Sequence, residues 1–382
     1  MAYQILTTAT LVDFLKQLKV MEPWFGDCAG LEVYPLSEGS INAVFRVVQP
    51  SSGVSVIVKQ AVPFVRSAGE GYPLDRRRMD IEMAALQMAA DVVPSMVPRV
   101  LYRSVELSVV ILQDLFDCQM LNAAILAARP LPHFAAQLAD FLAQTHFAYS
   151  RMSLSDEQRR SVMSDFVNEQ MCQLMMAVMF ESPFKHTEGN AVSEYLPIDV
   201  IASVRDDLQL LARVAMLKDN YLTKKQSLIH GDLHAGSIMV SDTQSYVIDP
   251  EFAFYGPIGF DIGCIFGNLY MFHFLHKHLA YESCRFEYAN WLLRCIDDIW
   301  ALYCKKFSAL WQSYDRQVVS SDIELFLAQV RADADGFAGV KLIRRVLGRD
   351  NLGYFSKMSC QRRRAIVERD VLAFARLLMS LF

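Results

Sequence analysis

The sequence lacks the features of a secreted or membrane-spanning chain. Its eight cysteines include no C-x-x-C pair, and in a chain of 382 residues this scattered spacing indicates buried thiols in a reducing compartment more than a disulfide framework. No charge-free apolar run reaches about 18 residues, the length that spans a bilayer. The start, MAYQILTTATLVDFLKQLKV, has no basic region before an apolar core, so it does not read as a signal peptide. We expect a cytoplasmic protein that does not cross a membrane.

The sequence also lacks the positive charge of a nucleic-acid-binding protein. The net charge is −5, and the dense basic runs are the short segments Arg76–Arg78 and Arg362–Arg364. Both are flanked by helix-forming residues, so we interpret them as solvated helix faces. We therefore expect no nucleic-acid partner.

Apolar residues are plentiful: they make up 53% of the chain, and charged residues make up 21%. A chain of this length exceeds the usual size of one domain, which predicts about two lobes. Residues 9–20 have a helical pattern, and two valine-rich runs on either side of Pro50–Gly53 predict a β-hairpin. A helix over 75–90 and a strand over 108–115 complete a β-rich first part.

Beyond residue 118 the pattern becomes mainly helical. One interruption, from 227 to 250, contains the strand-like runs SLIHGDL, SIMV and SYVIDP. The expected organisation is α+β and bilobal, with a small lobe over 1–112, a hinge over 113–118 and a large helical lobe over 119–382. The helices expected in the large lobe cover 119–128, 132–150, 155–180, 197–218, 285–312, 320–332, 336–347 and 361–381.

The interruption carries two groups of acids, seventeen residues apart. In IHGDLHAGSIMV, Gly231 lets the backbone turn after a strand and places Asp232 on a loop, a setting suited to orienting an attacking hydroxyl or accepting its proton. In SYVIDPE, Asp249 and Glu251 offer hard carboxylate oxygens that suit Mg²⁺. Phosphoryl transfer needs this combination of a group that positions the nucleophile and a metal on the nucleotide. A third acid, Asp261, is placed to cap amides or brace the first loop.

A zinc site is the competing interpretation of the same stretch. His230 and His234 are four residues apart, but Gly231 and the loop setting argue against the helix that such a pair would need. No third ligand follows at a useful spacing. We therefore expect these histidines to brace the loop.

HGDLHAGSIMV followed by VIDPEFAFYGPIGFDIG resembles the aminoglycoside-phosphotransferase-like branch of the protein-kinase fold, and within it the methylthioribose kinases. Most members of that branch have H-G-D-x-x-x-x-N, with the Asn as a metal ligand, followed by D-x-D. This chain has Ser237 and D-P-E (Asp249, Pro250, Glu251) instead, which are departures typical of methylthioribose kinases. The resemblance implies a kinase-like fold, with ATP and Mg²⁺ as cofactors, Asp249 and Glu251 as metal ligands, and a homodimer.

The sequence signals for nucleotide binding are less specific than the two acidic motifs. LSEGSINAVFRV (36–47) stands where a phosphate loop is expected, but it contains one glycine, Gly39; the resemblance puts Asn42 near the nucleotide. Lys59 matches the strand lysine that meets the α- and β-phosphates. We predict that Glu82 pairs with Lys59, with Glu70 as an alternative. The hinge QDL, comprising Gln113, Asp114 and Leu115, would meet adenine through backbone groups, although Asp114 and Asp117 also suit solvent-facing linker acids.

On the acceptor side, the resemblance implies that an arginine of an I-R-R motif contacts the sugar. Arg344 is the first choice and Arg345 the reserve, because adjacent helix positions point about 100° apart. The implied reaction transfers the γ-phosphate of ATP to the anomeric hydroxyl of 5-methylthioribose, held by Asp232, in methionine salvage. The segment 64–74 with Phe254 and Tyr255 is a candidate lining for the methylthio group.

Two alternatives remain open at this point. One is a kinase of the same branch that acts on choline, homoserine or an aminoglycoside. The other is a pseudokinase that binds nucleotide as a scaffold, which usually requires loss of the strand lysine, the loop Asp or the metal Asp. All three are present, as Lys59, Asp232 and Asp249.

Overall fold

The computed structural model describes residues 3–36, 41–66, 69–187, 189–190, 192–279, 283–315, 318–348, 354–355, 358 and 360–382. The chain divides into two compact units. The first comprises Met1–Gln119 and Tyr246–Phe252, and the second Met120–Ser245 and Ala253–Phe382. The D-P-E motif therefore belongs to the first unit, whereas the sequence placed it in the large lobe. The expected boundaries at 112 and 118 stay predictions.

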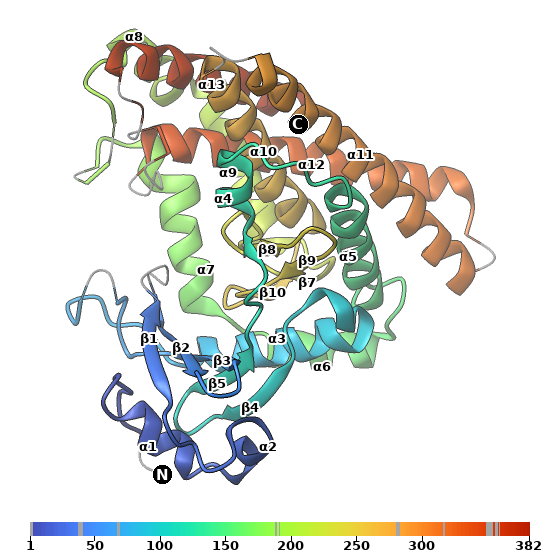
Figure 1. Ribbon diagram of the computed structural model, residues 1–382. Helices are drawn as coiled ribbons and strands as arrows, with labels where there is room; N and C mark the ends of the chain where they lie inside the picture. Colours follow the sequence, from blue (N-terminus) through green and yellow to red (C-terminus); the bar gives the residue numbers. More distant parts are fainter. Residues whose placement is uncertain are drawn as a thin grey trace. The chain divides into compact units, whose positions relative to one another are not determined.

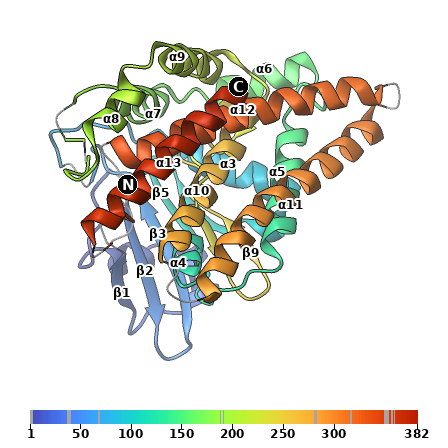
Figure 2. The ribbon, with the colours of Figure 1, turned by 90° about the horizontal axis from the view of Figure 1, so that it is seen from above.

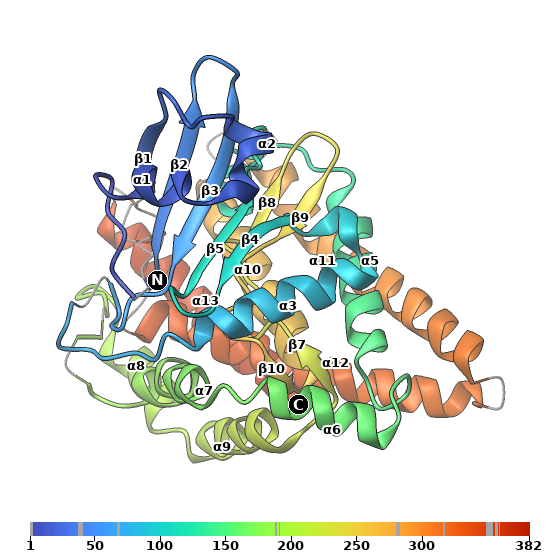
Figure 3. The same cartoon turned by 90° about the horizontal axis from the view of Figure 1, so that it is seen from below.

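A five-stranded antiparallel sheet forms the centre of the first unit, in the order β1–β2–β3–β5–β4, which Figure 3 shows. The predicted hairpin is confirmed: Ala43 pairs with Gln60 and Gln49 pairs with Val54 around the turn. Alternate residues of β2 are buried, as a strand with one face on a core requires. The strands are β1 (Glu32–Leu36), β2 (Ala43–Gln49), β3 (Val54–Gln60), β4 (Val100–Ser104) and β5 (Val109–Gln113).

The helices of the first unit are short except for one. The helix expected over 9–20 is present only as α1 (Leu11–Lys16), followed by the 3-10 turn η1 (Lys19–Met21) and α2 (Glu22–Phe25). Apolar residues of these pieces pack with Val47 and Val56 of the sheet. The helix expected over 75–90 is α3 (Arg78–Val92), followed by the 3-10 turn η2 (Pro94–Met96). Helix α3 contacts β4 and β5.

The second unit is mainly helical (Figure 1). The run expected over 155–180 is two helices separated near Asn168, and the first begins with a capping box of Ser155 and Gln158. The elements up to the catalytic stretch are α4 (Leu121–Leu126), α5 (Phe134–Ala148), α6 (Asp156–Asp165), α7 (Glu169–Met176), the π-helical turn η3 (Ala177–Glu181), η4 (Ser182–Phe184), α8 (Ile198–Arg205), α9 (Leu208–Thr223), β7 (Ser227–Ile229) and β8 (Ile238–Val240).

The remaining elements of this unit are β10 (Phe254–Gly256), which pairs with β7, and the helices α10 (Ile258–Leu279), α11 (Ser283–Tyr314), α12 (Ser320–Leu347) and α13 (Gln361–Leu381). Two short strands, β6 (Gln119–Met120) and β9 (Ser245–Val247), lie where the chain passes from one unit to the other. The two helices expected over 320–332 and 336–347 form one continuous helix, α12, because Gly336 stays helical inside it. A Cβ at Gly336 would lie 2.8 Å from Leu217 Cδ2, so close packing explains the glycine.

Helix α10 is the central element of the second unit and packs against α11, α12 and α13 (Figure 2). Ile258 to His276 are all buried. By length and apolar composition, α10 alone among the described helices is a candidate membrane span, but its apolar window lies entirely inside the unit. The cysteines that the structure describes are free thiols. Cys28, Cys264 and Cys295 are buried as expected, whereas Cys118, Cys172 and Cys304 are half-buried and Cys360 is exposed.

Candidate active site

Lys59 gathers acids at the end of β3 in the first unit. Its Nζ lies 2.7 Å from Glu82 Oε2 and also contacts Asp249 Oδ1. Burial alone would lower the pKa of Lys59, but Asp249, Glu82 and Glu251 raise it above its usual value, so the lysine is charged. Glu82 is therefore the partner of Lys59, whereas the alternative, Glu70, is an exposed loop residue.

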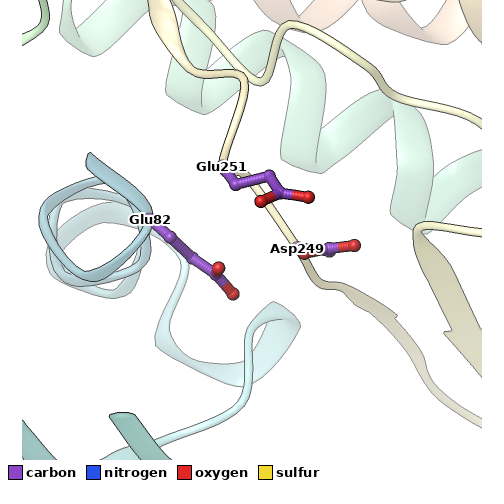
Figure 4. Close-up of side chains that lie close together, drawn as sticks. All are labelled: Glu82, Asp249 and Glu251. Carbon is purple, nitrogen blue, oxygen red and sulfur yellow. The ribbon is translucent and has the colours of Figure 1, made fainter. Parts of the chain in front are cut away.

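Three carboxylates converge at this point: Glu82 from α3, and Asp249 and Glu251 from the segment after β9 (Figure 4). One oxygen of each lies within 4.8 Å of the others. Burial, followed by the charges of neighbouring acids, raises the pKa of Glu251 to about 8; burial also raises that of Glu82 to about 7, against the effect of Lys59. Asp249 has a left-handed backbone, with φ 68°, and its side chain is 43% exposed. Hard oxygens that repel one another fit a divalent cation such as Mg²⁺.

Arg78 contacts the acidic group through Glu251 and Asn42. Its role is not among those predicted from the sequence. The run Arg76–Arg78 was expected on a solvated face, which is wrong for Arg78: it is 2% exposed. Its Nε donates to Asn42 Oδ1 at 3.0 Å and lies 3.5 Å from Glu251 Oε2, while Asn42 Nδ2 donates to Glu251 Oε2 at 2.8 Å. The signal was present in the helical spacing, because Arg78 shares the inward face of α3 with Glu82. Asn42 thus contacts a predicted metal ligand directly.

The side chains of the predicted hinge residues are buried or make hydrogen bonds and ion pairs. Asp114 accepts from Ser55 Oγ at 2.7 Å and lies 2.9 Å from Arg46 Nε, so it is buried and is not the solvent-facing linker acid considered as an alternative. Gln113 Oε1 accepts from the Arg99 amide at 3.4 Å, and Leu115 is buried. Contact of this segment with adenine stays a prediction. The expected phosphate-loop glycine, Gly39, lies outside the described residues.

In the second unit, β7 leads into a tightly braced loop. Gly231 has φ 82°, a conformation that glycine adopts without strain. The amides of His230 and Gly231 donate to Asp261 Oδ2 at 2.7 Å and Oδ1 at 3.0 Å, which confirms the expected bracing by Asp261. Since Asp261 lies in the first turn of α10, the loop is attached to the central helix of the unit.

Asp232 occupies a cationic pocket of this loop. Lys341 Nζ on α12 lies 2.8 Å from Asp232 Oδ1, and His234 Nε2 lies 3.4 Å from Oδ2. Burial would raise the pKa of Asp232, but Lys341, His234 and Arg344 lower it well below its usual value. The carboxylate is therefore ionised and able to accept a hydrogen bond from a hydroxyl. Lys341 is not among the site residues predicted from the sequence, although a lysine within the apolar run GVKLI is a visible signal.

Ser237 closes the loop through backbone contacts. Its Oγ accepts from the His234 amide at 2.8 Å and is 3.1 Å from Asp232 O, to which it can donate. The two histidines also accept from the loop: His230 Nδ1 from the Asp232 amide at 3.3 Å, and His234 Nδ1 from the Gly236 amide at 2.8 Å. The side chain that stands at the family's metal-ligand position thus shapes the loop around Asp232.

The arginine pair lies in the last turn of α12, and both arginines are buried, at 7% and 2% exposure. The sequence predicted that only one of these two arginines points into the protein. Helix α12 packs against several elements, including α9, α10 and α13, so more than one of its faces is covered. Arg344 contributes to the low pKa of Asp232, and Arg345 to the lowered pKa of His234, whose largest cause is burial.

The suggested pocket aromatics belong to the core. Phe254 and Tyr255 lie on β10 and are 4% and 3% exposed. Tyr255 Oη donates to Tyr149 O at 2.6 Å, and the Phe254 ring packs 4.9 Å from that of Tyr221. The structure therefore gives these two side chains a packing role. In the segment 64–74, residues 67–68 lie outside the described residues.

Comparison with known proteins covers nearly the whole chain. A profile of the phosphotransferase enzyme family matches residues 32–275. The methylthioribose kinase of Geobacillus kaustophilus (strain HTA426) is 33% identical over 358 residues, which cover 93% of this chain and 88% of the relative. Methylthioribose kinase 1 of Oryza sativa subsp. japonica is 32% identical over 397 residues, covering 99% and 92%. A choline kinase structure from Cryptosporidium parvum Iowa II has a TM-score of 0.50 at 13% identity, covering 98% of this chain and 94% of that one, and is similar in fold.

Proposed function

Since the chain belongs to the phosphotransferase enzyme family and, within it, to the methylthioribose kinases, we propose that it transfers the γ-phosphate of ATP to the anomeric hydroxyl of 5-methylthioribose. The product is 5-methylthioribose 1-phosphate, in methionine salvage. The observation that carries this proposal is the carboxylate of Asp232, which lies half-buried beside Lys341 on a braced loop and is able to hold a hydroxyl.

The first unit supplies the residues for the phosphate donor. Lys59, kept charged by its acids, binds the α- and β-phosphates, and Glu82 keeps its ammonium in place. Asp249 and Glu251 would hold Mg²⁺, which when bound neutralises negative charge on the phosphates. Asn42 and Arg78 orient Glu251.

The second unit supplies the residues for the acceptor. Asp232 accepts a hydrogen bond from the anomeric hydroxyl and so directs its oxygen at the γ-phosphorus. The oxygen–phosphorus bond forms, the bond from the γ-phosphorus to the bridging oxygen of ADP breaks, and the hydroxyl proton passes to Asp232. Arg344, with Arg345 as the reserve, contacts the sugar.

Direct turnover of purified protein with Mg·ATP tests this assignment. The acceptors to compare are 5-methylthioribose, choline, homoserine and an aminoglycoside, with ADP release and phosphorylated product both measured. We expect turnover with 5-methylthioribose. Turnover only with choline, homoserine or the aminoglycoside would replace the acceptor, and nucleotide binding without turnover on any acceptor would favour a pseudokinase.

We also propose that the protein acts as a cytoplasmic homodimer without nucleic-acid or membrane partners. The net charge of −5 and the burial of α10 support the absence of those partners. Light scattering on a size-exclusion column tests the dimer, because a monomer would elute with a mass near 43.4 kDa.

A further inference from the structure

Lys341 is a fully buried lysine on α12. Its side chain has no exposed surface, and its ammonium lies 2.8 Å from Asp232 Oδ1. Among the residues that the structure describes, Asp232 is the acid within ion-pair distance of Lys341. A buried ammonium is costly unless a carboxylate compensates it, so the pairing is a strong constraint on both side chains.

Helix packing sets the position of Lys341. The stem of the lysine lies against Gly267 of α10, where an added Cβ would be 3.0 Å from Lys341 Cβ and 3.3 Å from its Cγ. The loop that bears Asp232 is attached to the same helix through Asp261 and through Asn268, whose Oδ1 accepts from the Ala235 amide at 3.2 Å. Lys341 packs against α10, and the loop that bears Asp232 is hydrogen-bonded to α10. The helix therefore holds the two side chains in a defined geometry.

The second oxygen of Asp232 has a weaker partner. His234 Nδ1 accepts from the Gly236 amide, so a neutral ring carries its proton on Nε2, 3.4 Å from Asp232 Oδ2. Burial, together with Lys341 and Arg345, lowers the pKa of His234 and keeps the ring neutral. The other titratable groups that influence Asp232 or respond to it are Arg344 on α12, Tyr221 on α9 and Cys264 on α10.

We propose that Lys341 is a positioning residue for phosphoryl transfer: it binds one carboxylate oxygen of Asp232 and leaves the other directed at the acceptor hydroxyl. This role rests on the proposed function, because it presupposes that Asp232 holds an acceptor. With Lys341 in place, Asp232 stays an anion and a weak base. It therefore orients the hydroxyl through most of the transfer and takes the proton as the oxygen–phosphorus bond forms.

The test compares Lys341→Met with Lys224→Met. Lys224 Nζ lies 2.7 Å from the buried Asp333 in the same unit, so the control also removes a lysine from its carboxylate partner. For Lys341→Met we expect kcat to fall by about 100-fold or more while KM for both substrates changes by less than about threefold. In the pH profile of kcat/KM, the midpoint of the acid limb should shift to a higher pH by about one unit or more, because Asp232 loses the cation that keeps it ionised. Lys224→Met should leave kcat and the limb unchanged.

A fall in kcat with an unmoved acid limb, or a kcat within threefold of wild type, would overturn the positioning role. A second measurement requires no substrate: thermal unfolding of Lys341→Met, Asp232→Asn and the double variant. We expect the double variant to be more stable than the sum of the single losses predicts, since each single change leaves the remaining side chain without its ion-pair partner. Additive losses would reject the pair. Failure of wild type to phosphorylate 5-methylthioribose would instead contradict the proposed function and leave this coupling measurable.

Discussion

At the residue scale, the environment of each carboxylate decides its chemistry. Asp232 lies among Lys341, His234 and Arg344, which hold its pKa low, whereas Glu251 lies beside Asp249 and Glu82 and has its pKa raised to about 8. The first carboxylate is therefore stable as a lone anion near a hydroxyl. The second has a raised pKa, and a further cation beside Arg78 and Lys59 would favour its ionised form.

Replacement of Asp232 by Asn should abolish transfer and leave nucleotide binding intact. The amide keeps the shape and can still accept a hydrogen bond, but it has no negative charge and cannot take the hydroxyl proton, so kcat should fall by about 1000-fold or more. The affinity for ATP, measured by titration calorimetry, should stay within about twofold, since the residues proposed to bind the nucleotide belong to the other unit. Near-normal turnover of Asp232→Asn would show that the assigned role is wrong.

Glu251 predicts a pH dependence of stability in metal-free protein. Its folded pKa of about 8 lies above the ordinary value of 4.5, so its contribution is fully present below about pH 4.5 and is lost as the pH rises through about 8. Over this window, Glu251→Gln should flatten the fall in Tm measured by calorimetry. The control Glu287→Gln changes an exposed glutamate of α11 and should keep the wild-type slope. An identical slope for both variants would show that Glu251 does not cause the fall in Tm with pH.

At the element scale, glycines decide how closely two helices pack. Gly259, Gly263 and Gly267 recur every four residues on α10 and face α12. This spacing places them on one side of the helix, where the absence of side chains lets the backbones approach. The approach brings Lys341 of α12 against α10, and so couples ordinary helix packing to the geometry at Asp232.

Gly263→Ala should therefore destabilise the protein. The new Cβ would lie 2.5 Å from Ala334 O and 2.7 Å from Phe337 Cβ, so α12 must shift. Overpacking of this kind costs about 1–3 kcal/mol, measurable by denaturant unfolding. Gly71→Ala is the control, because nothing lies within 4 Å of a Cβ there. Equal stability of the two variants would contradict tight α10–α12 packing.

For the molecule as a whole, the residues proposed for the reaction are distributed over both units. The first unit contains Lys59 and the acids proposed for the nucleotide, and the second contains Asp232 and the arginines proposed for the acceptor. The segment Tyr246–Phe252 joins the first unit although the chain on both sides of it belongs to the second. Sequence order alone does not reveal such an exchange.

Binding of Mg·ATP should raise the Tm of the whole protein, and Lys59→Met should abolish most of the increase. A ligand at 100 times its Kd stabilises the folded state by about 2.7 kcal/mol, and the variant loses the cation that we propose binds the phosphates. Lys225→Met, which changes a lysine of the second unit near the Phe254 ring, should keep the wild-type increase. A full increase in Lys59→Met would contradict the predicted nucleotide role of Lys59.

Local patterns in the sequence predict the residues of the candidate site and much of the secondary structure. The β2–β3 hairpin follows from local patterning, and Lys59, Asp232 and the D-P-E acids stand out by residue type and local setting. These signals are short-range, so they survive without knowledge of the fold.

Which charges are buried, and which groups they contact, depends on how the helices and strands pack together. In the sequence, Arg78 belongs to a basic run that is expected to face solvent, and Lys341 is a single polar residue in an apolar segment. In the structure, each side chain is buried and lies beside a carboxylate that is far away in the sequence. Long-range contacts of this kind depend on how α3, α10 and α12 pack. The physical reason is that burial removes solvent, so a pairing that is weak at the surface becomes obligatory in the interior.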